Sequence, residues 1–246
     1  MIKELGPGFR LMLALTVLTG LLYPAVMTGI SEALFPRQAN GSLVTQSGKV
    51  VGSSLIGQSF SKPEYFHPRP SSAGAGYDAT ASSGSNLGPT SAKLLHGTTK
   101  TDDKGKEIVD FDGIADRIVH YCVDNDLPYI SSVPLDQFKD AQGNLDDVKL
   151  IKAFNDTKTP LVFTPKVQIP SDAVTGSASG LDPHISPANA DLQIGRVAKA
   201  RNASPDKVRS LIAEATNRPA FGFIGEPRVN VLLLNISLDE KFPPRK

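Results

Sequence analysis

The chain has 246 residues, of which 40% are hydrophobic and 21% are charged, and its formal net charge is +1. A charge this close to zero excludes the basic surface on which nucleic-acid binding depends, so we expect no nucleic-acid partner. The length suits one good-sized domain. Cys122 is the only cysteine, which excludes an intrachain disulfide.

The N-terminal region contains an apolar segment. Residues 11–31 carry no charged side chain, and Arg10 and Glu32 close its two ends. As a helix with a rise of about 1.5 Å per residue, the segment covers roughly 31 Å, the thickness of the hydrocarbon core of a bilayer. A cleavable signal peptide is the rival interpretation, but its apolar region is shorter and ends at a small-x-small site, a pattern missing from residues 32–36. We therefore predict a retained transmembrane helix over residues 11–34, after a short cytoplasmic stretch of residues 1–10.

The charges that flank this segment indicate its orientation. Lys3, Arg10 and the terminal amine crowd the short N-terminal side, whereas Arg37 and Lys49 lie on the long side. By a small margin, the positive-inside rule places the N-terminus in the cytoplasm. Residues 35–246 are then an extracytoplasmic domain of a single-pass protein of the cell (inner) membrane.

Four residues at four-residue spacing share one face of the predicted helix. Small residues let a second helix approach closely, and hydroxyl groups can hydrogen-bond across such a contact. A lone anchor with scattered threonine and glycine explains the spacing equally well. The proline of the set removes a backbone hydrogen bond and predicts a kink. The four residues are Thr16, Gly20, Pro24 and Thr28.

The rest of the chain predicts a mixed α/β (α+β) domain. The pair Ser47-Gly48 separates two short extended segments, residues 42–46 and 49–52, and so predicts a tight hairpin. Residues 62–91 are crowded with proline, glycine and serine, as in a flexible linker, but Tyr65 and Tyr77 are among the aromatic residues that recur within them. Such anchors favour an ordered irregular loop.

Hydrophobic spacing predicts the remaining elements. Apolar residues at positions 111, 114, 118 and 122 form a helical stripe. The polar and charged residues 98–107 and 136–147 predict exposed loops. Serine-proline pairs at 186–187 and 204–205 predict two helix starts, and the apolar residues 229–238 predict a strand that is packed on both faces.

Motifs for catalysis are missing from the sequence. It has no GxxxxGK[ST] phosphate loop, no GxGxxG after a strand and no GxSxG elbow. The DKTGT motif of P-type ATPases is absent, and Asp103-Lys104-Gly105 shares only a fragment of it. The histidines lack metal-ligand spacing among themselves, so we expect a non-catalytic chain with no metal site and no cofactor of its own. They are His67, His96, His120 and His184.

Several separated blocks resemble the Kdp C-subunit family, which belongs to Kdp-type potassium-transporting P-type ATPases. The strongest block, residues 174–202, reads VTGSASGLDPHISPANADLQIGRVAKARN. The blocks follow one another in the family's order. The others are FPRQANGS (35–42), GSSLIGQSF (52–60), YFHPRPS (65–71), SSGSNLGP (82–89) and VNV (229–231).

The resemblance implies an accessory subunit in a high-affinity, ATP-driven potassium uptake complex. Its partners would be a potassium-binding channel-like subunit, an ATP-hydrolysing P-type subunit and the lipid bilayer. The helix face with Thr16, Gly20 and Thr28 then becomes a docking surface. Because a near-neutral domain cannot concentrate K⁺ electrostatically, we expect it to act by contact, with Asp182 and the turn after it as contact points.

The family has also been described as a catalytic chaperone that raises the affinity of the ATPase subunit for ATP. The residues that would contact ATP here are Ser177, Ser179, Gly180 and Gln193, since glycine and serine can present N–H and hydroxyl groups to phosphates and a glutamine amide can bond ribose. A tight turn before the helix start at Ser186 explains the same residues. The predicted orientation also places them across the membrane from cytoplasmic ATP, which favours the contact role.

One segment departs from the family pattern. Residues 93–172 are longer than the single helix and short loop expected at this place, and they are charged and rich in turns. We interpret the surplus as a surface insertion. The alternative function is an independent membrane-anchored extracytoplasmic domain for binding or sensing, which would purify without large multi-span partners.

Overall fold

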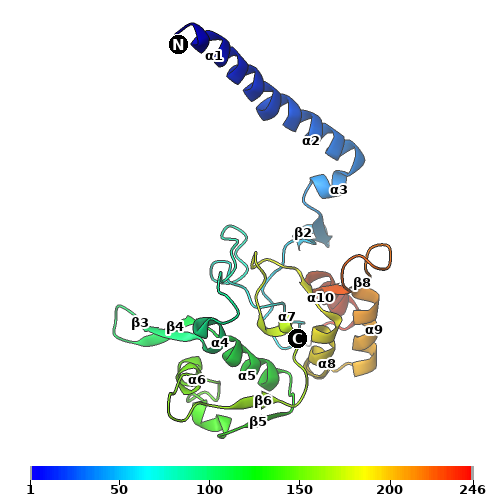
Figure 1. Ribbon diagram of the computed structural model, residues 1–246. Helices are drawn as coiled ribbons and strands as arrows, with labels where there is room; N and C mark the ends of the chain where they lie inside the picture. The colour runs from blue at the N-terminus through cyan, green and yellow to red at the C-terminus, as the bar shows by residue number, and fades with distance from the viewer. Residues whose placement is uncertain (1, 245–246) are drawn as a thin grey trace. The chain divides into compact units, whose positions relative to one another are not determined.

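The structure, a computed structural model, describes residues 2–244 and divides into one unit that ends at Leu55 and a second that begins at Ile56. Figure 1 shows the elements along the chain. The first unit begins with a continuous helix built of α1 (Ile2–Val17), a π-helical turn η1 (Leu18–Leu22) and α2 (Tyr23–Leu34). A short helix α3 (Pro36–Ala39) and a hairpin follow.

The long helix confirms the predicted apolar helix and extends it toward the N-terminus. Its stretch Glu4–Leu34 is long and apolar enough to cross a membrane. The hydroxyl of Thr16 donates to the carbonyl of Met12 at 2.9 Å, so this polar group is satisfied within the helix, as a membrane-spanning helix would need. The turn Leu18–Leu22 ends two residues before Pro24, where the missing N–H and the bulky ring oppose regular α-helical bonding.

The hairpin consists of β1 (Leu43–Gln46) and β2 (Lys49–Ser53). Ser47 and Gly48 have φ angles of 51° and 76°, so both central residues of the turn have positive φ, as two-residue hairpins prefer. This confirms the predicted hairpin.

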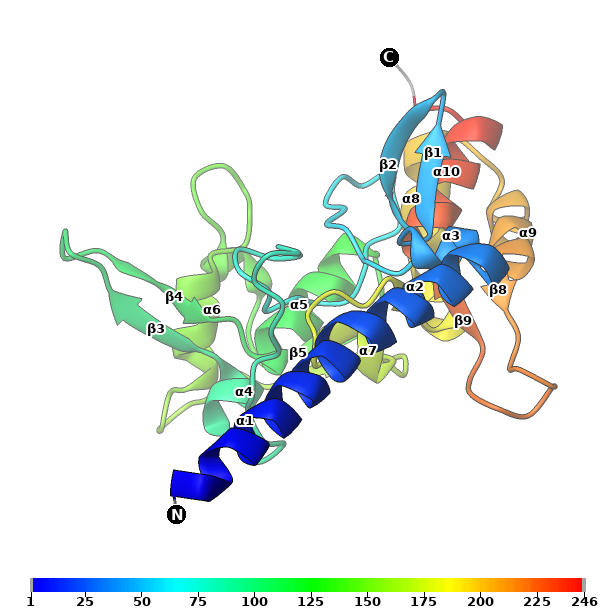
Figure 2. The same ribbon diagram turned by 90° about the horizontal axis from the view of Figure 1, so that it is seen from above.

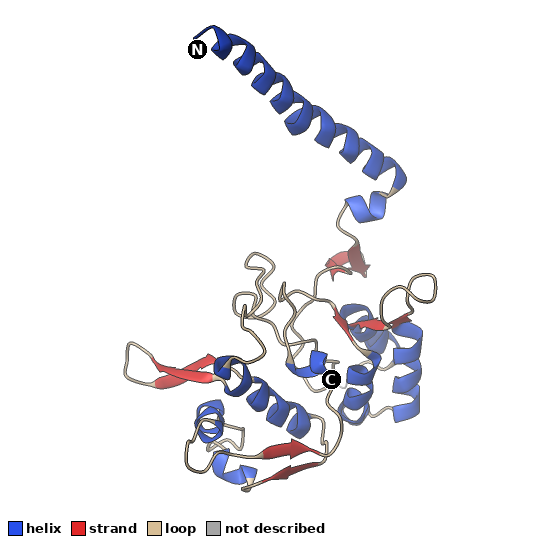
Figure 3. Ribbon diagram, in the orientation of Figure 1, coloured by secondary structure: helices blue, strands red, loops and turns tan. Residues whose placement is uncertain are grey.

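The second unit combines helices with small antiparallel sheets, which confirms the expected mixed fold (Figure 3). Strand β3 pairs with β4, β5 with β6, and β9 lies between β7 and β8. The elements are α4 (Ala92–His96), β3 (Thr98–Thr101), β4 (Glu107–Phe111), α5 (Ile114–Asp124), β5 (Tyr129–Ser131), η2 (Leu135–Phe138), α6 (Asp147–Phe154), β6 (Phe163–Pro165), α7 (Ser171–Val174), β7 (His184–Ile185), α8 (Pro187–Arg201), α9 (Pro205–Ala215), β8 (Thr216–Asn217), β9 (Arg228–Asn230) and α10 (Val231–Lys241).

Two hydrophobic cores hold this unit together. In the first, helices α8, α9 and α10 pack around residues such as Val197, Leu211 and Leu234. In the second, Val119 of α5 packs against Leu150 of α6 and its neighbours. Figures 1 and 2 show α8–α10 gathered on one side and β3, β4 and α6 on the other, with α5 between them.

Residues 57–91 contain no helix or strand, yet they are anchored in the first core. Phe66 is fully buried there. Its N–H donates to Oδ1 of Asn235 at 2.9 Å, and its carbonyl accepts from Nδ2 of the same side chain at 3.0 Å. A buried asparagine of α10 thus holds the loop, which confirms the predicted ordered loop over residues 62–91.

The predicted strand over residues 229–238 is wrong. Only Arg228–Asn230 is a strand, and helix α10 begins at Val231. The side chain of Asn230 accepts from the N–H of Leu233 at 3.1 Å and so caps this helix. The buried positions 231, 234, 235 and 238 follow the helical i, i+3, i+4, i+7 pattern, which an almost continuously apolar run hides.

Residues 98–107 were predicted as a loop but form most of the β3–β4 hairpin. Threonine favours extended backbone, and the loop is confined to the turn between the strands. There Oδ1 of Asp102 accepts from the N–H groups of Lys104 and Lys106 at 2.9 and 2.8 Å. Both predicted helix starts are confirmed, since α8 begins at Pro187 and α9 at Pro205.

Candidate functional site

The blocks quoted above meet where the loop of residues 57–91 lies against residues 175–184. Arg69 makes an ion pair with Asp182 at 3.0 Å. The same guanidinium donates to the carbonyls of Thr175 and Gly176, both at 3.3 Å. One side chain therefore ties two segments that are far apart in the sequence.

The turn at Gly180 fits tightly against this loop. Its carbonyl accepts from the hydroxyl of Ser71 at 2.7 Å, and that hydroxyl accepts from the N–H of Tyr77 at 2.9 Å. Gly180 has a φ angle of +67°, and an added Cβ atom would lie 2.6 Å from the carbonyl oxygen of Ser83. Both the φ angle and the close approach demand glycine here.

Asp182 has its contacts inside the domain. Besides the ion pair with Arg69, it accepts from the N–H of His184 at 3.0 Å. Burial alone would raise the pKa of Asp182, but the hydrogen bonds from His184 and the charge of Arg69 bring it below the ordinary value of 3.8. The predicted partner contact is thus a half-buried carboxylate that stabilises the turn to which it belongs.

Gln193 is buried in helix α8 and uses its full hydrogen-bonding capacity. Its Oε1 accepts from the N–H of His67 at 2.7 Å and from Nη2 of Arg196 at 2.7 Å. Its Nε2 donates to the carbonyl of His67 at 3.1 Å and to Oδ1 of Asn189 at 2.9 Å. A contact between this amide and a ribose would require at least one of these bonds to break.

Ser177 and Ser179 lie away from that network, on the turn that ends at Gly180. Their hydroxyl groups are 3.3 Å apart, and Ser179 is exposed. Ser177 lines a cavity of about 570 Å³ together with residues 83–88. The structure therefore keeps Ser177, Ser179 and Gly180 together but gives Gln193 different contacts.

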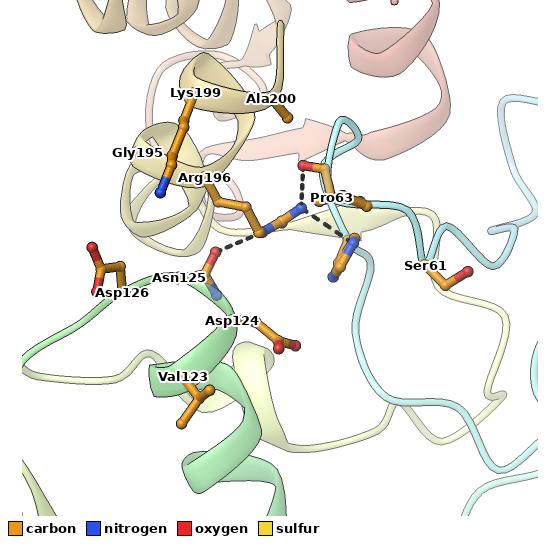
Figure 4. A pocket seen from close by; sticks show the side chains of 11 residues that line it. Ser61, Pro63, Val123, Asp124, Asn125, Asp126, Gly195, Arg196, Lys199 and Ala200 are labelled. Carbon is orange, nitrogen blue, oxygen red and sulfur yellow. Dashed lines mark hydrogen bonds between the residues drawn. The ribbon is translucent and has the colours of Figure 1, made fainter. Parts of the chain in front are cut away.

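A larger cavity, of about 760 Å³, lies beside Arg196. Figure 4 shows Arg196 and Lys199 on one wall and Asp124, Asn125 and Asp126 on the other. With basic and acidic side chains facing each other, the cavity lacks the excess of positive charge that would favour a triphosphate.

The guanidinium of Arg196 is buried among neutral acceptors. Nε donates to Oδ1 of Asn125 at 3.0 Å, and Nη1 donates to the carbonyls of Pro63 and Tyr65, both at 2.8 Å. Burial lowers the pKa of Arg196 to about 10. Sequence reasoning missed this residue, although a basic residue between the apolar Ile194 and Val197 was a usable signal.

His67 lies next to this guanidinium, 3.2 Å from Nη1. Arg196 donates both Nη1 hydrogens to backbone carbonyls, so neither is available to Nε2 of His67. Nε2 therefore carries a hydrogen of its own, which it donates to the carbonyl of Lys62 at 3.0 Å. Burial, followed by the charge of Arg196, lowers the pKa of His67 below 6.5. The imidazole is therefore neutral at physiological pH.

Three further residues could hold a metal ion: Asp116 and His120 of α5 and Asp147 of α6. Their ligand atoms all lie within 4.8 Å of one another. The distance from His120 Nε2 is 2.7 Å to Asp147 Oδ1 and 4.0 Å to Asp116 Oδ2. Sequence reasoning considered only histidine pairs and so missed the i, i+4 pair of Asp116 and His120.

The predicted docking residues of the helix are available for contact. Thr16, Gly20 and Thr28 are exposed on the helix. A Cβ atom added at Gly20 would have no neighbouring atom within 4 Å.

The second unit has an exposed apolar tip, since Phe221 and Phe223 expose 88% and 79% of their surface. These aromatic residues were not predicted as a site.

Comparison with known proteins decides the family. The family model KdpC, described as the K⁺-transporting ATPase c chain, matches residues 5–116 and 140–240. The chain belongs to the KdpC family. The match includes every predicted docking and ATP-contact residue, and residues 117–139 lie outside it.

Full-length KdpC relatives agree with this assignment. The potassium-transporting ATPase KdpC subunit of Caulobacter vibrioides (strain NA1000 / CB15N) is 44% identical over 245 residues, 99% of this chain and 96% of that protein. The KdpC subunit of Mycobacterium bovis (strain BCG / Pasteur 1173P2) is 42% identical over 237 residues, 96% of this chain and 98% of that protein. The KdpC subunit of Beijerinckia indica subsp. indica is 42% identical over 243 residues, 99% and 96% of the two chains.

Proposed function

We propose that this chain is a non-catalytic, membrane-anchored accessory subunit of an ATP-driven potassium uptake complex. Membership of the KdpC family carries the proposal. In the complex the chain stabilises the association of a potassium-binding channel-like subunit with an ATP-hydrolysing P-type subunit. It works by contact, because its net charge of +1 provides no field to attract K⁺.

The helical segment of residues 11–34 anchors the subunit in the bilayer and docks against the partners. Two observations support this role: the helix is long and apolar enough to span a membrane, and Gly20 leaves room for a close helix–helix contact. Purification of the full chain in mild detergent tests the proposal directly. Two large multi-span proteins should accompany it, whereas an independent binding or sensing domain would purify alone.

Residues 35–246 lie on the outer face of the cell membrane, with the N-terminus in the cytoplasm. Lys3 and Arg10 support this orientation through the positive-inside rule. A single cysteine at the exposed Ser47, in a Cys122→Ser background, should react with a membrane-impermeant thiol reagent in intact cells. A cysteine at Glu4 is the matched control and should react only after the membrane is opened. The reverse pattern would overturn the orientation.

A chaperone role toward ATP is the second candidate, and the turn Ser177–Gly180 favours it. Ser179 is exposed, and Ser177 lines a cavity with the Gly/Ser-rich residues 83–88. Backbone N–H and hydroxyl groups of this kind can hold phosphate. Under this role Ser179→Ala weakens ATP binding by the complex with only a small loss of stability, since its exposed hydroxyl accepts one backbone hydrogen bond, from the N–H of Leu181 at 3.1 Å. Gln193→Ala, by contrast, breaks four internal hydrogen bonds and destabilises the domain.

A further inference from the structure

Helices α5 and α6 bring three ligand-type side chains to one point. Asp116 and His120 are four residues apart on α5 and so lie on the same face. Asp147 is the first residue of α6. The three ligand atoms lie within 4.8 Å of one another, although the third residue comes from a different helix.

The environment of Asp116 points to a positively charged ligand. The residue is only 2% exposed, and within the part of the chain that the structure describes its Oδ1 has no hydrogen-bond partner. Arg117 of the same helix is paired with both carboxylate oxygens of Asp112 at 2.7 and 2.9 Å, and Nε2 of His120 lies 4.0 Å from Oδ2 of Asp116. A buried carboxylate oxygen without a hydrogen-bond partner is costly, and a cation held by Asp116, His120 and Asp147 would offset that cost.

We propose that Asp116, His120 and Asp147 form a binding site for a divalent transition-metal ion such as Zn²⁺. One imidazole nitrogen and two carboxylate oxygens are ligands that Zn²⁺ accepts, and water completes the tetrahedron. In a tetrahedral zinc site neighbouring ligand atoms lie about 3.3–3.5 Å apart. The distances of 2.7 Å and 4.0 Å from His120 Nε2 lie on either side of this value, and the two carboxylate ligand atoms lie within 4.8 Å of each other, so side-chain rotations would be needed to close the site around an ion.

An ion and its water can reach the site from solvent. The side chains of His120 and Asp147 are 34% and 45% exposed, whereas that of Asp116 is 3% exposed. Asp116 thus forms the floor of the site, and the other two ligands form its open rim. On binding, Nε2 of His120 gives its proton to solvent and its lone pair to the metal.

The consequence of binding is a link between the two helices of the second core. Val119 and Leu150, on the same helices, are fully buried in that core. An ion bound only by the folded protein stabilises it in proportion to the logarithm of the ion's concentration. Zn²⁺ should therefore fix α6 on α5 without any role in nucleotide or potassium binding.

Titration of the full chain in detergent with ZnCl₂ alone, after treatment with a chelator, tests the site. We expect saturable binding of one Zn²⁺ per chain and a thermal midpoint that rises with Zn²⁺ concentration. Asp116→Asn, His120→Gln and Asp147→Asn should each weaken binding about 10-fold or more and abolish the rise. Asp136→Asn is the matched control, since its carboxylate belongs to the same region but is 83% exposed; it should bind as the parent does.

Misfolding cannot imitate the expected result. Asp116→Asn keeps the shape of a buried side chain whose Oδ1 has no hydrogen-bond partner, so the metal-free variant should be about as stable as the parent. Loss of Zn²⁺ binding together with retained stability supports the site. The absence of saturable binding, or equal Zn²⁺ affinity in the parent and the three variants, would overturn it.

Discussion

Nε of Arg196 donates to Oδ1 of Asn125 at 3.0 Å, which joins helix α8 of the first core to the C-terminal end of α5 in the second. Nη1 of the same guanidinium holds the carbonyls of Pro63 and Tyr65. One buried cation thus connects both cores with the irregular loop. Among the described residues the strands pair only within small separate sheets, so side-chain contacts such as this one hold the two cores together.

We predict that Arg196→Ala destabilises the second unit by about 2–4 kcal/mol, because several buried acceptors lose a charged donor at once. Urea unfolding of the full chain in detergent measures this loss. Lys199→Ala, an exposed position on the same helix, is the control and should change stability by less than about 0.5 kcal/mol. Similar effects of the two substitutions would contradict the connecting role of Arg196.

A second prediction concerns pH and His67. Burial and Arg196 hold the pKa of His67 below its ordinary value of 6.5, so the unfolded chain binds this proton more readily than the folded one. The contribution of neutral His67 to the free energy of unfolding should therefore be complete at pH values well above 6.5. It should fall as the pH drops through 6.5 toward the lower pKa of the folded state. His67→Gln removes the titrating group, and its unfolding free energy should decline less between about pH 7.5 and pH 5.5. Equal declines in the parent and the variant would refute this assignment.

Two glycines should respond to alanine in opposite directions. At Gly180, with its φ angle of +67° and a backbone oxygen in the way, alanine should cost about 1–3 kcal/mol. At Gly195 a Cβ atom would have no neighbour within 4 Å in helix α8, so alanine should stabilise the domain by up to about 1 kcal/mol. Thermal unfolding of the two variants and the parent under identical conditions measures both changes in stability, and the midpoint should fall for Gly180→Ala and rise for Gly195→Ala.

Gly20→Leu should weaken the association with the partner subunits, because a bulky side chain keeps a neighbouring helix at a distance. The yield of co-purified partners measures the effect. Leu21→Phe changes an exposed apolar residue on another side of the helix and serves as the control. An undiminished yield with Gly20→Leu would leave the helix as a simple anchor.

The aromatic tip gives the last prediction. Phe221 and Phe223 are almost fully exposed, so Phe221→Ser together with Phe223→Ser should leave the stability of the isolated chain within about 0.5 kcal/mol. If the tip contacts a partner subunit, the same double substitution lowers the yield of the complex. An unchanged yield in the double variant would place the tip outside the subunit interface.

Local signals explain what the sequence predicted well. The Ser47-Gly48 turn and the helix starts at Ser186 and Ser204 depend on a few adjacent residues, and all three were confirmed. Residues 229–238 failed because a run that is apolar throughout has no clear period. In that case the deciding feature was the single cap residue Asn230.

The contacts of the candidate sites depend on distant segments and could not be read in this way. Gln193 resembles a surface amide in the sequence, but its partner His67 is 126 residues away. Likewise Asp147 reaches His120 only because α6 packs on α5. The residue types were visible from the sequence, whereas their neighbours are set by tertiary packing.

The π-helical turn at Leu18–Leu22 also alters the angular phase of the long N-terminal helix. In a regular α-helix, each step of four residues turns about 40° further around the helix axis than a full turn. Thr28 would therefore lie about 120° around the axis from Thr16. A π-turn accommodates about one extra residue, so it turns the following helix back by about 100°. Thr16, Gly20 and Thr28 therefore lie on a nearly straight seam parallel to the helix axis. A neighbouring helix can follow this seam without coiling, and bulky substitutions at both of its ends would meet the same neighbour.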